Sequence, residues 1–263
     1  MIEELEKNIK SEYNIRLNEI IKNTESTVGN VYMLNCDNNK YVAKVYNNIK
    51  HVKSMIKLHE ELNKNQIYAP EIIKNNDGIG YTKINSENYY VVLYSFLEGH
   101  QVTWDKTKIK LTDNEIIVLA NSLRKLHELN NNSEIKLPKI PFGNYKKRKS
   151  ILHFDLTKQN IFINQDKMGF IDFDDAKFGE SICDVSILIA NLFCSKTRGA
   201  NLDGMNKFID AYYAEDLQIK QEETGLIKQY AIDWINYVLA GNEFSASITE
   251  SFHVKRKLIE EYL

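Results

Sequence analysis

The sequence predicts an α+β fold with two lobes: a small N-terminal lobe of antiparallel strands over residues 1–97, and a larger helical lobe over residues 98–263. Three observations favour it. Segments rich in β-branched and aromatic residues crowd the N-terminal part. Beyond residue 182 the sequence is almost entirely helical in character. A single apolar hairpin, at residues 160–173, interrupts the helical part.

Composition fits an ordinary globular protein. Of the 263 residues, 43% are hydrophobic and 11% aromatic, which is enough for a substantial core. The 34 basic and 36 acidic side chains give a net charge of -2, so no nucleic-acid partner that needs a basic face is expected. The three cysteines, Cys36, Cys183 and Cys194, form no CxxC pair and predict reduced thiols. With no signal-like N-terminus and no apolar run of about 18 residues, we expect a soluble cytoplasmic protein without a membrane partner.

The N-terminal lobe begins with a weak helical rhythm over residues 4–22. Residues 29–35 and 40–46 read as a hairpin around a polar tip, and a helix is expected at residues 51–64. Three further strands are predicted at residues 70–74, 78–84 and 89–97. The last of them is continuously apolar, as a central strand would be.

The helical lobe opens with a predicted helix over residues 113–129. Its apolar residues recur on one stripe, and Asp113 is expected to cap its N-terminus. His127 lies on the same stripe, where we expect a packed core histidine rather than a ligand.

The apolar hairpin carries polar residues at its ends. Strands at residues 160–163 and 168–173 follow the loop "HFDLTKQ". Asp155 and Asn160 are five residues apart across this loop, and Asp172 follows the second strand as it returns to the same edge, so three oxygen ligands are expected to converge. Mg²⁺ prefers such ligands together with substrate phosphates. The hairpin therefore predicts phosphoryl transfer, in which an aspartate accepts the proton of an attacking hydroxyl.

The segments "HFDLTKQN" and "IDFDD" resemble the HxDxxxxN catalytic loop and the metal-binding aspartate of the aminoglycoside phosphotransferase and choline kinase superfamily. That superfamily shares the two-lobed protein-kinase-like fold, and the resemblance covers most of the chain. Phe173 and Asp174 follow Asp172, so no DFG is present, which favours a small-molecule kinase. The resemblance implies a phosphotransferase with an alcohol group as acceptor, using ATP or GTP and Mg²⁺.

The resemblance also implies a role for each motif residue. Asp155 would be the catalytic base, and Asn160 and Asp172 would be the metal ligands. His153 would brace the loop. Asp184, in "CDVSILI", matches the later aspartate of the family that supports the catalytic loop.

The N-terminal lobe supplies the expected nucleotide site. Lys44 in "YVAKVY" resembles the strand lysine that pairs the α- and β-phosphates. We choose Glu60 as its helix partner, although Glu61 is adjacent and the positions upstream carry no acid; replacement of this ion pair is the alternative.

Two loops complete that site. The turn "STVGNVY" would cover the phosphates through Ser26, Thr27 and Gly29, although an ordinary tight turn explains it equally well. "YSFLEG" resembles the family hinge, where backbone groups around Ser95 and Leu97 would bind the nucleotide base.

The acceptor is expected against the helical lobe. Residues 201–263 carry eleven acidic against six basic side chains, so a cationic, hydroxyl-bearing acceptor such as an aminoglycoside is predicted, held partly by Asp233 or Glu243. Solvated helix faces explain the same charges. Trp234, Tyr230 and Tyr237 share one helical stripe and could hold a cation, although a packed core is the commoner use.

Two alternatives stay open. One is a choline, ethanolamine or other metabolite kinase in place of an antibiotic-modifying enzyme. The other is a non-catalytic binding protein that keeps the fold. In each case the expected partners are a nucleotide and a small molecule, and the chain is expected to be a monomer.

Overall fold

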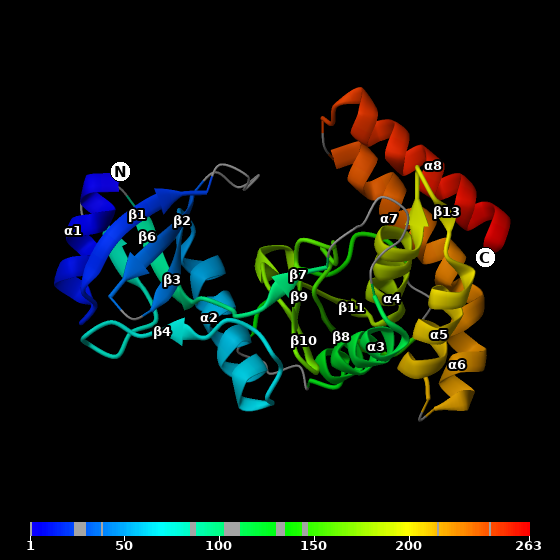
Figure 1. The fold of residues 1–263 in the computed structure, drawn as a ribbon, viewed down its shortest axis with the longest axis horizontal. Helices are drawn as coiled ribbons and strands as arrows, with labels where there is room; N and C mark the ends of the chain where they lie inside the picture. The colour runs from blue at the N-terminus through cyan, green and yellow to red at the C-terminus, as the bar shows by residue number, and fades with distance from the viewer. Residues whose placement is uncertain are drawn as a thin grey trace. The chain divides into compact units, whose positions relative to one another are not determined.

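The computed structural model describes residues 2–23, 30–37, 39–84, 88–102, 111–129, 135–143, 147–214, 216–241 and 243–263. Within these, the chain forms two compact units. The first contains residues up to Glu98 and a short return that includes Lys136; the second begins at Gly99 and contains the rest of the described chain. The α+β class is confirmed, with an N-terminal antiparallel sheet and a helical C-terminal part (Figure 1).

The first unit is built on a six-stranded antiparallel sheet with strand order β1-β2-β3-β6-β4, and β5 also pairs with β6. Its strands are β1 (Leu17–Lys22), β2 (Val31–Cys36), β3 (Lys40–Tyr46), β4 (Ile72–Ile73), β5 (Thr82–Ile84) and β6 (Tyr89–Ser95). β6 pairs with β3 along one edge and with β4 and β5 along the other, so the expected central strand is confirmed.

One helix packs on each face of this sheet. α1 (Ile2–Glu12) buries Leu5 and Ile9 in a core with residues of β2, β3 and β6. α2 (Ile49–Lys64) covers the opposite face through Val52 and Ile56, which pack against Val92 of β6. The alternation of side chains along the strands thus supplies two apolar layers.

The expected helical rhythm over residues 4–22 is correct only for its first half. The chain is helical up to Glu12, and Leu17–Lys22 is then the strand β1, paired with β2. The two isoleucines that suggested a longer helix, Ile15 and Ile20, pack instead at the edge of the sheet core.

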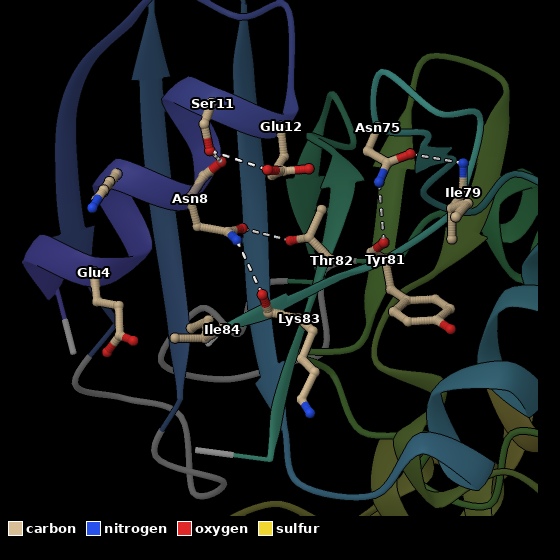
Figure 2. A pocket seen from close by; sticks show the side chains of 11 residues that line it. Glu4, Asn8, Ser11, Glu12, Asn75, Ile79, Tyr81, Thr82, Lys83 and Ile84 are labelled. Carbon is tan, nitrogen blue, oxygen red and sulfur yellow. Dashed lines mark hydrogen bonds between the residues drawn. The ribbon is translucent and has the colours of Figure 1, made fainter. Parts of the chain in front are cut away.

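Figure 2 shows the hydrogen bonds that join α1 to β5. Asn8 points from the helix toward Thr82, whose hydroxyl donates to its amide oxygen, and its nitrogen donates to the backbone carbonyl of Lys83. Side chains of α1 and of the β4 to β5 region line a hollow of about 400 Å³ at this junction.

The second unit combines helices with short two- and three-stranded ladders. Its helices are α3 (Asp113–His127), α4 (Ile182–Leu188), α5 (Leu202–Tyr212), α6 (Leu217–Glu223), α7 (Ile227–Gly241) and α8 (Ala246–Tyr262). Its strands are β7 (His100–Gln101), β8 (Lys149–Leu152), β9 (Ile161–Asn164), β10 (Lys167–Phe170), β11 (Lys177–Glu180), β12 (Cys194–Ser195) and β13 (Gly199–Ala200). The core forms where α3 packs on α5 and α4 packs on α7. Among the described residues, no helix has the length and apolar character needed to cross a bilayer.

The helix expected at residues 113–129 is present, but its cap lies one residue earlier. The side chain of Thr112 accepts from the backbone N–H of Glu115, and the carboxylate of Glu115 accepts from the backbone N–H of Thr112. This is a reciprocal capping box. Asp113 is therefore the first residue of the helix, where its negative charge suits the N-terminal end.

Candidate functional site

Two antiparallel ladders position the catalytic motif. β8 leads into the loop 153–160, and β9 and β10 form the predicted hairpin. After Asp172 and a short 3-10 turn, β11 returns and pairs with β8, with Lys177 opposite Leu152. The segments that carry Asp155 and Asp172 are therefore held between paired strands.

Asn160 is joined directly to Asp155. Its side-chain nitrogen donates to the backbone carbonyl of Asp155 at 2.9 Å and to the Asp155 carboxylate at 2.8 Å. A backbone bond from Asn160 to Thr157 tightens the same turn. Both of these side-chain bonds are made by the amide nitrogen. The amide oxygen, Oδ1, takes part in neither, and an amide oxygen is a type of ligand that Mg²⁺ binds.

Asp155 lies among other carboxylates. Burial raises the pKa of Asp155 above its usual value, and the charges of Asp175 and Asp172 raise it further, while His153 and the Asn160 hydrogen bond act in the opposite direction. Three neighbouring carboxylates repel one another in a partly desolvated site. Among the described residues, no three acidic, histidine or cysteine side chains lie close enough together to hold a metal ion by themselves, so a divalent cation here would need further oxygen ligands such as the Asn160 amide or substrate phosphates.

His153 connects the loop to the second strand of the hairpin. Its Nε2 lies 2.8 Å from the carbonyl of Ile171, which can only accept, so Nε2 carries the proton. The Nδ1 atom then accepts from the backbone N–H of Asp155 at 3.3 Å. One histidine thereby links the segment of Asp155 to the residue that precedes Asp172.

Two residues of the site have left-handed backbone conformations. Phe154 has φ of 68° and Asp172 has φ of 66°. Aspartate tolerates this region better than phenylalanine, for which it is a strained conformation. At Phe154 the backbone N–H donates to Asp184 at 2.9 Å, which helps to hold the strained residue in place.

Asp184 fixes the catalytic loop from α4. This fully buried carboxylate accepts from the backbone N–H groups of His153, at 2.7 Å, and Phe154. His127 of α3 contacts it through Nε2 at 3.2 Å. Burial lowers the pKa of His127, so the neutral ring donates this bond. His127 is buried, as expected, yet it is also part of the support for the loop.

The support extends to residues that the sequence did not indicate. His127 Nδ1 accepts from the hydroxyl of Tyr212, at 2.6 Å. The same hydroxyl accepts from the guanidinium of Arg148 at 2.8 Å. Neither residue belongs to a motif, and only the fold brings α5 and the start of β8 together here.

A second unexpected link reaches the loop from the C-terminal helix. Asn191 lies in a single π-helical turn, Ile189–Phe193, and its side-chain nitrogen donates to the carbonyl of Leu156 at 3.1 Å. Its oxygen accepts from the ammonium of Lys255, at 2.7 Å. π-Helical turns often occur at functional sites. The residue next to Asp155 is therefore tied to α8.

The residues expected to bind the nucleotide belong to the first unit. Lys44 is half-buried on β3, and its ammonium lies 5.9 Å from the centre of the Tyr94 ring. The carboxylate of Glu60 lies with Lys57, at 3.2 Å, and with Lys74, at 3.8 Å. The structure therefore does not bring Glu60 to Lys44.

The hinge residues follow the central strand. The backbone N–H of Ser95 donates to the carbonyl of Glu71, and the N–H of Glu71 donates to the Ser95 hydroxyl. The N–H of Ser95 is thus already used within the sheet. Leu97 is buried in the segment after β6. Ser26, Thr27 and Gly29 lie outside the described residues.

The residues expected to bind the acceptor lie at the C-terminal part of the second unit. Asp233 is half-buried on α7 and accepts from Gln229 at 2.8 Å, whereas Glu243 is exposed between α7 and α8. Trp234 and Tyr230 are core residues, so the packed-core interpretation holds for both. Tyr237 is 41% exposed, and its ring lies 5.8 Å from that of Phe154, beside Asp155.

Comparison with known proteins agrees with this geometry. Residues 135–217, which contain the catalytic loop, Asp172 and Asp184, match the model of the phosphotransferase enzyme family. Over these residues the chain is similar to that family. The resemblance seen in the motifs is confirmed, and so is the enzyme class, a phosphotransferase, at the level of the family.

Solved structures show the same fold over nearly the whole chain. An amicoumacin kinase in complex with AMP-PNP, Ca²⁺ and Ami has a TM-score of 0.71 at 14% identity, covering 98% of this chain and 93% of its own. A microcompartment-associated aminopropanol kinase has a TM-score of 0.72 at 14% identity, covering 97% and 94%. A spectinomycin phosphotransferase in complex with ADP and spectinomycin has a TM-score of 0.65 at 14% identity, covering 98% and 96%. A search of curated sequences found no match.

Proposed function

We propose that this protein is a kinase that transfers the γ-phosphate of ATP or GTP to a hydroxyl group of a small, hydrophilic and cationic acceptor, such as an aminoglycoside. The observation that carries the proposal is the direct pairing of Asn160 with Asp155 within a loop that Asp184 holds by two backbone bonds. A base and a metal ligand fixed in one loop are what phosphoryl transfer to a hydroxyl requires.

Each catalytic residue then has a defined task. Asp155 accepts the proton of the acceptor hydroxyl, and its hydrogen bond from Asn160 keeps its carboxylate oriented for that task. Asn160, through Oδ1, and Asp172, through its carboxylate, would hold Mg²⁺. When bound, Mg²⁺ neutralises charge on the β- and γ-phosphates. His153 and Asp184 fix the loop while the proton moves.

The first unit would bind the nucleotide. Lys44 would pair the phosphates, with backbone donors of Ser26, Thr27 and Gly29 covering them. The base would lie against the segment of Ser95 and Leu97. We assign no such role to Glu60, because its carboxylate pairs with Lys57 and Lys74.

The acceptor class rests on charge. The excess of acids in residues 201–263 supports a cationic acceptor, and the half-buried Asp233 and exposed Glu243 would contribute to binding it. The structurally similar kinases are named for different acceptors, among them spectinomycin and aminopropanol, which supports an amine-bearing alcohol without choosing one. Choline, ethanolamine and related metabolites remain alternatives. A monomeric, cytoplasmic enzyme stays a prediction.

An acceptor panel tests this proposal. The full chain is incubated with Mg²⁺ and γ-labelled ATP or GTP, and with aminoglycosides, choline, aminopropanol or neutral sugars at two salt concentrations. We expect label on cationic alcohols and weaker acceptor binding at high salt, as exposed charges require. Equal turnover of neutral and cationic acceptors would contradict the cationic class, and nucleotide binding without any transfer would favour a non-catalytic binding protein.

A further inference from the structure

The sheet register places Lys44 beside Tyr94 on the face that α2 covers. Val42 lies opposite Tyr94, and Lys44 lies opposite Val92, so Lys44 and Tyr94 are diagonal neighbours on adjacent strands. Diagonal neighbours are within reach of long and aromatic side chains. The ammonium of Lys44 lies 5.9 Å from the centre of the Tyr94 ring, within the range of a cation–π contact.

Tyr94 is itself firmly held. It is 5% exposed, and the His59 ring of α2 packs edge-on against it, with centroids 5.0 Å apart. His59 donates through Nδ1 to the carbonyl of Pro70 at 2.8 Å, so its ring is fixed as well. The Tyr94 hydroxyl lies 3.1 Å from that of Tyr46. Lys44 therefore meets a ring with a defined orientation.

α2 offers no carboxylate at this position. The structure describes every residue of this helix, and none of its buried residues is acidic. Its two glutamates face other partners: Glu60 pairs with Lys57 and Lys74, and Glu61 pairs with Lys64 at 3.8 Å. The side chain that α2 directs at Tyr94 is the imidazole of His59.

We propose that Tyr94 is the positioning residue of Lys44, aiming its ammonium at the nucleotide phosphates in place of a helix carboxylate. The proposal rests on the proposed function, in which Lys44 pairs the phosphates. A ring orients a cation without neutralising its charge. α2 then contributes rigidity through His59 rather than an ion pair.

The expected effect follows from the strength of such a contact. A cation–π contact of about 0.7 to 1.4 kcal/mol, within the range of such contacts, corresponds on loss of the ring to a decrease in nucleotide affinity of about threefold to tenfold. Because Tyr94 acts on the nucleotide only by orienting Lys44, removing the ring should not weaken nucleotide binding further in a variant that lacks Lys44.

A double-mutant cycle provides the test. Binding of Mg²⁺ and AMP-PNP to the full chain is measured by calorimetry for wild type, Tyr94→Leu, Lys44→Ala and the double variant. Tyr94→Phe keeps the ring and should bind like wild type. Tyr90→Leu is the matched control, because Tyr90 is the other diagonal neighbour of Lys44 on the same face of β6 but its ring packs on Tyr81. Thermal unfolding establishes that each variant is folded, and Tyr94→Met replaces Tyr94→Leu if the latter is not.

The outcomes separate the inference from the proposed function. We expect Tyr94→Leu to weaken binding about threefold to tenfold with Lys44 present and less than about twofold with Lys44→Ala. Unchanged affinity in Tyr94→Leu, or an equal loss with and without Lys44, overturns the inference alone. If Lys44→Ala binds the nucleotide as tightly as wild type, the nucleotide site of the proposed function is wrong, and the inference falls with it.

Discussion

Asn160 shows how one side chain can serve two purposes in the catalytic loop. Its amide nitrogen donates twice to Asp155, and this fixes which end of the amide faces the base. The two hydrogen bonds therefore also orient the amide oxygen, Oδ1. Asp172 is oriented by a different means, because its left-handed backbone turns the chain sharply after β10.

At the residue scale, the metal assignment predicts a specific loss. Asp172→Asn and Asn160→Ala should each weaken the Mg²⁺ dependence of nucleotide binding, because each alters an oxygen ligand. Calorimetric titration of AMP-PNP with and without Mg²⁺ measures this dependence. Asp166→Asn, in the exposed turn of the β9 to β10 hairpin, is the control. If both site variants keep the magnesium-linked affinity of wild type, neither residue is a ligand.

At the scale of elements, α3 and α4 act as supports for the loop. The carboxylate of Asp184 receives donors from His127 and from two consecutive backbone N–H groups, and the histidine is held in turn by Tyr212. All of these groups are buried, so each depends on the others for its hydrogen bonds.

This network predicts a large effect from a small change. Asp184→Asn keeps the shape of the side chain but replaces one acceptor oxygen with an NH₂ group, which faces one of the N–H groups that donate to the carboxylate. Buried donors are then left unpaired, so the free energy of unfolding should fall by about 2 to 3 kcal/mol. Urea unfolding measures it. Asp166→Asn should remain within about 0.5 kcal/mol of wild type. A variant of Asp184 as stable as wild type would contradict the supporting role.

The C-terminal helix is a second support, and it carries a titratable group. Burial lowers the pKa of Lys255 from 10.5 to about 8. The unfolded chain therefore binds this proton more tightly than the folded chain between about pH 8 and 10.5. The free energy of unfolding should rise with pH in that window, because deprotonation relieves the cost of burying the charge.

Lys255→Met should remove this contribution. As the pH rises from about 8 to 10, we expect the free energy of unfolding of the wild type to increase relative to that of the variant. The increase should be at most about 1.4 kcal/mol per pH unit. Burial raises the pKa of the neighbouring Cys194 to about 11, above this window, so its thiol stays largely protonated in both folded proteins and its contribution largely cancels in the comparison. Parallel pH profiles for the two proteins would show that Lys255 is not titrated as proposed.

At the scale of the whole molecule, the features that were predicted correctly are those that depend on patterns of neighbouring residues in the sequence. Period-two and helical spacing located the sheet, its central strand β6 and the helix α3, and the spacing of the catalytic loop led to the family. The change from helix to strand before Leu17 was missed because a few isoleucines fit both the helical repeat of 3.6 residues and the strand repeat of two. Tyr212, Asn191 and Lys255 were missed because long-range packing, which no local pattern records, brings them to the site.

Phosphoryl transfer by this chain depends most on Asp155 as the base. The most direct test is single-turnover transfer of labelled γ-phosphate from the Mg²⁺ nucleotide to an acceptor that the panel identifies, comparing wild type with Asp155→Asn and with Asp166→Asn as control. We predict that Asp155→Asn transfers phosphate about 10² to 10⁴ times more slowly, with nucleotide affinity within about threefold of wild type. Transfer by Asp155→Asn at the wild-type rate would contradict the account.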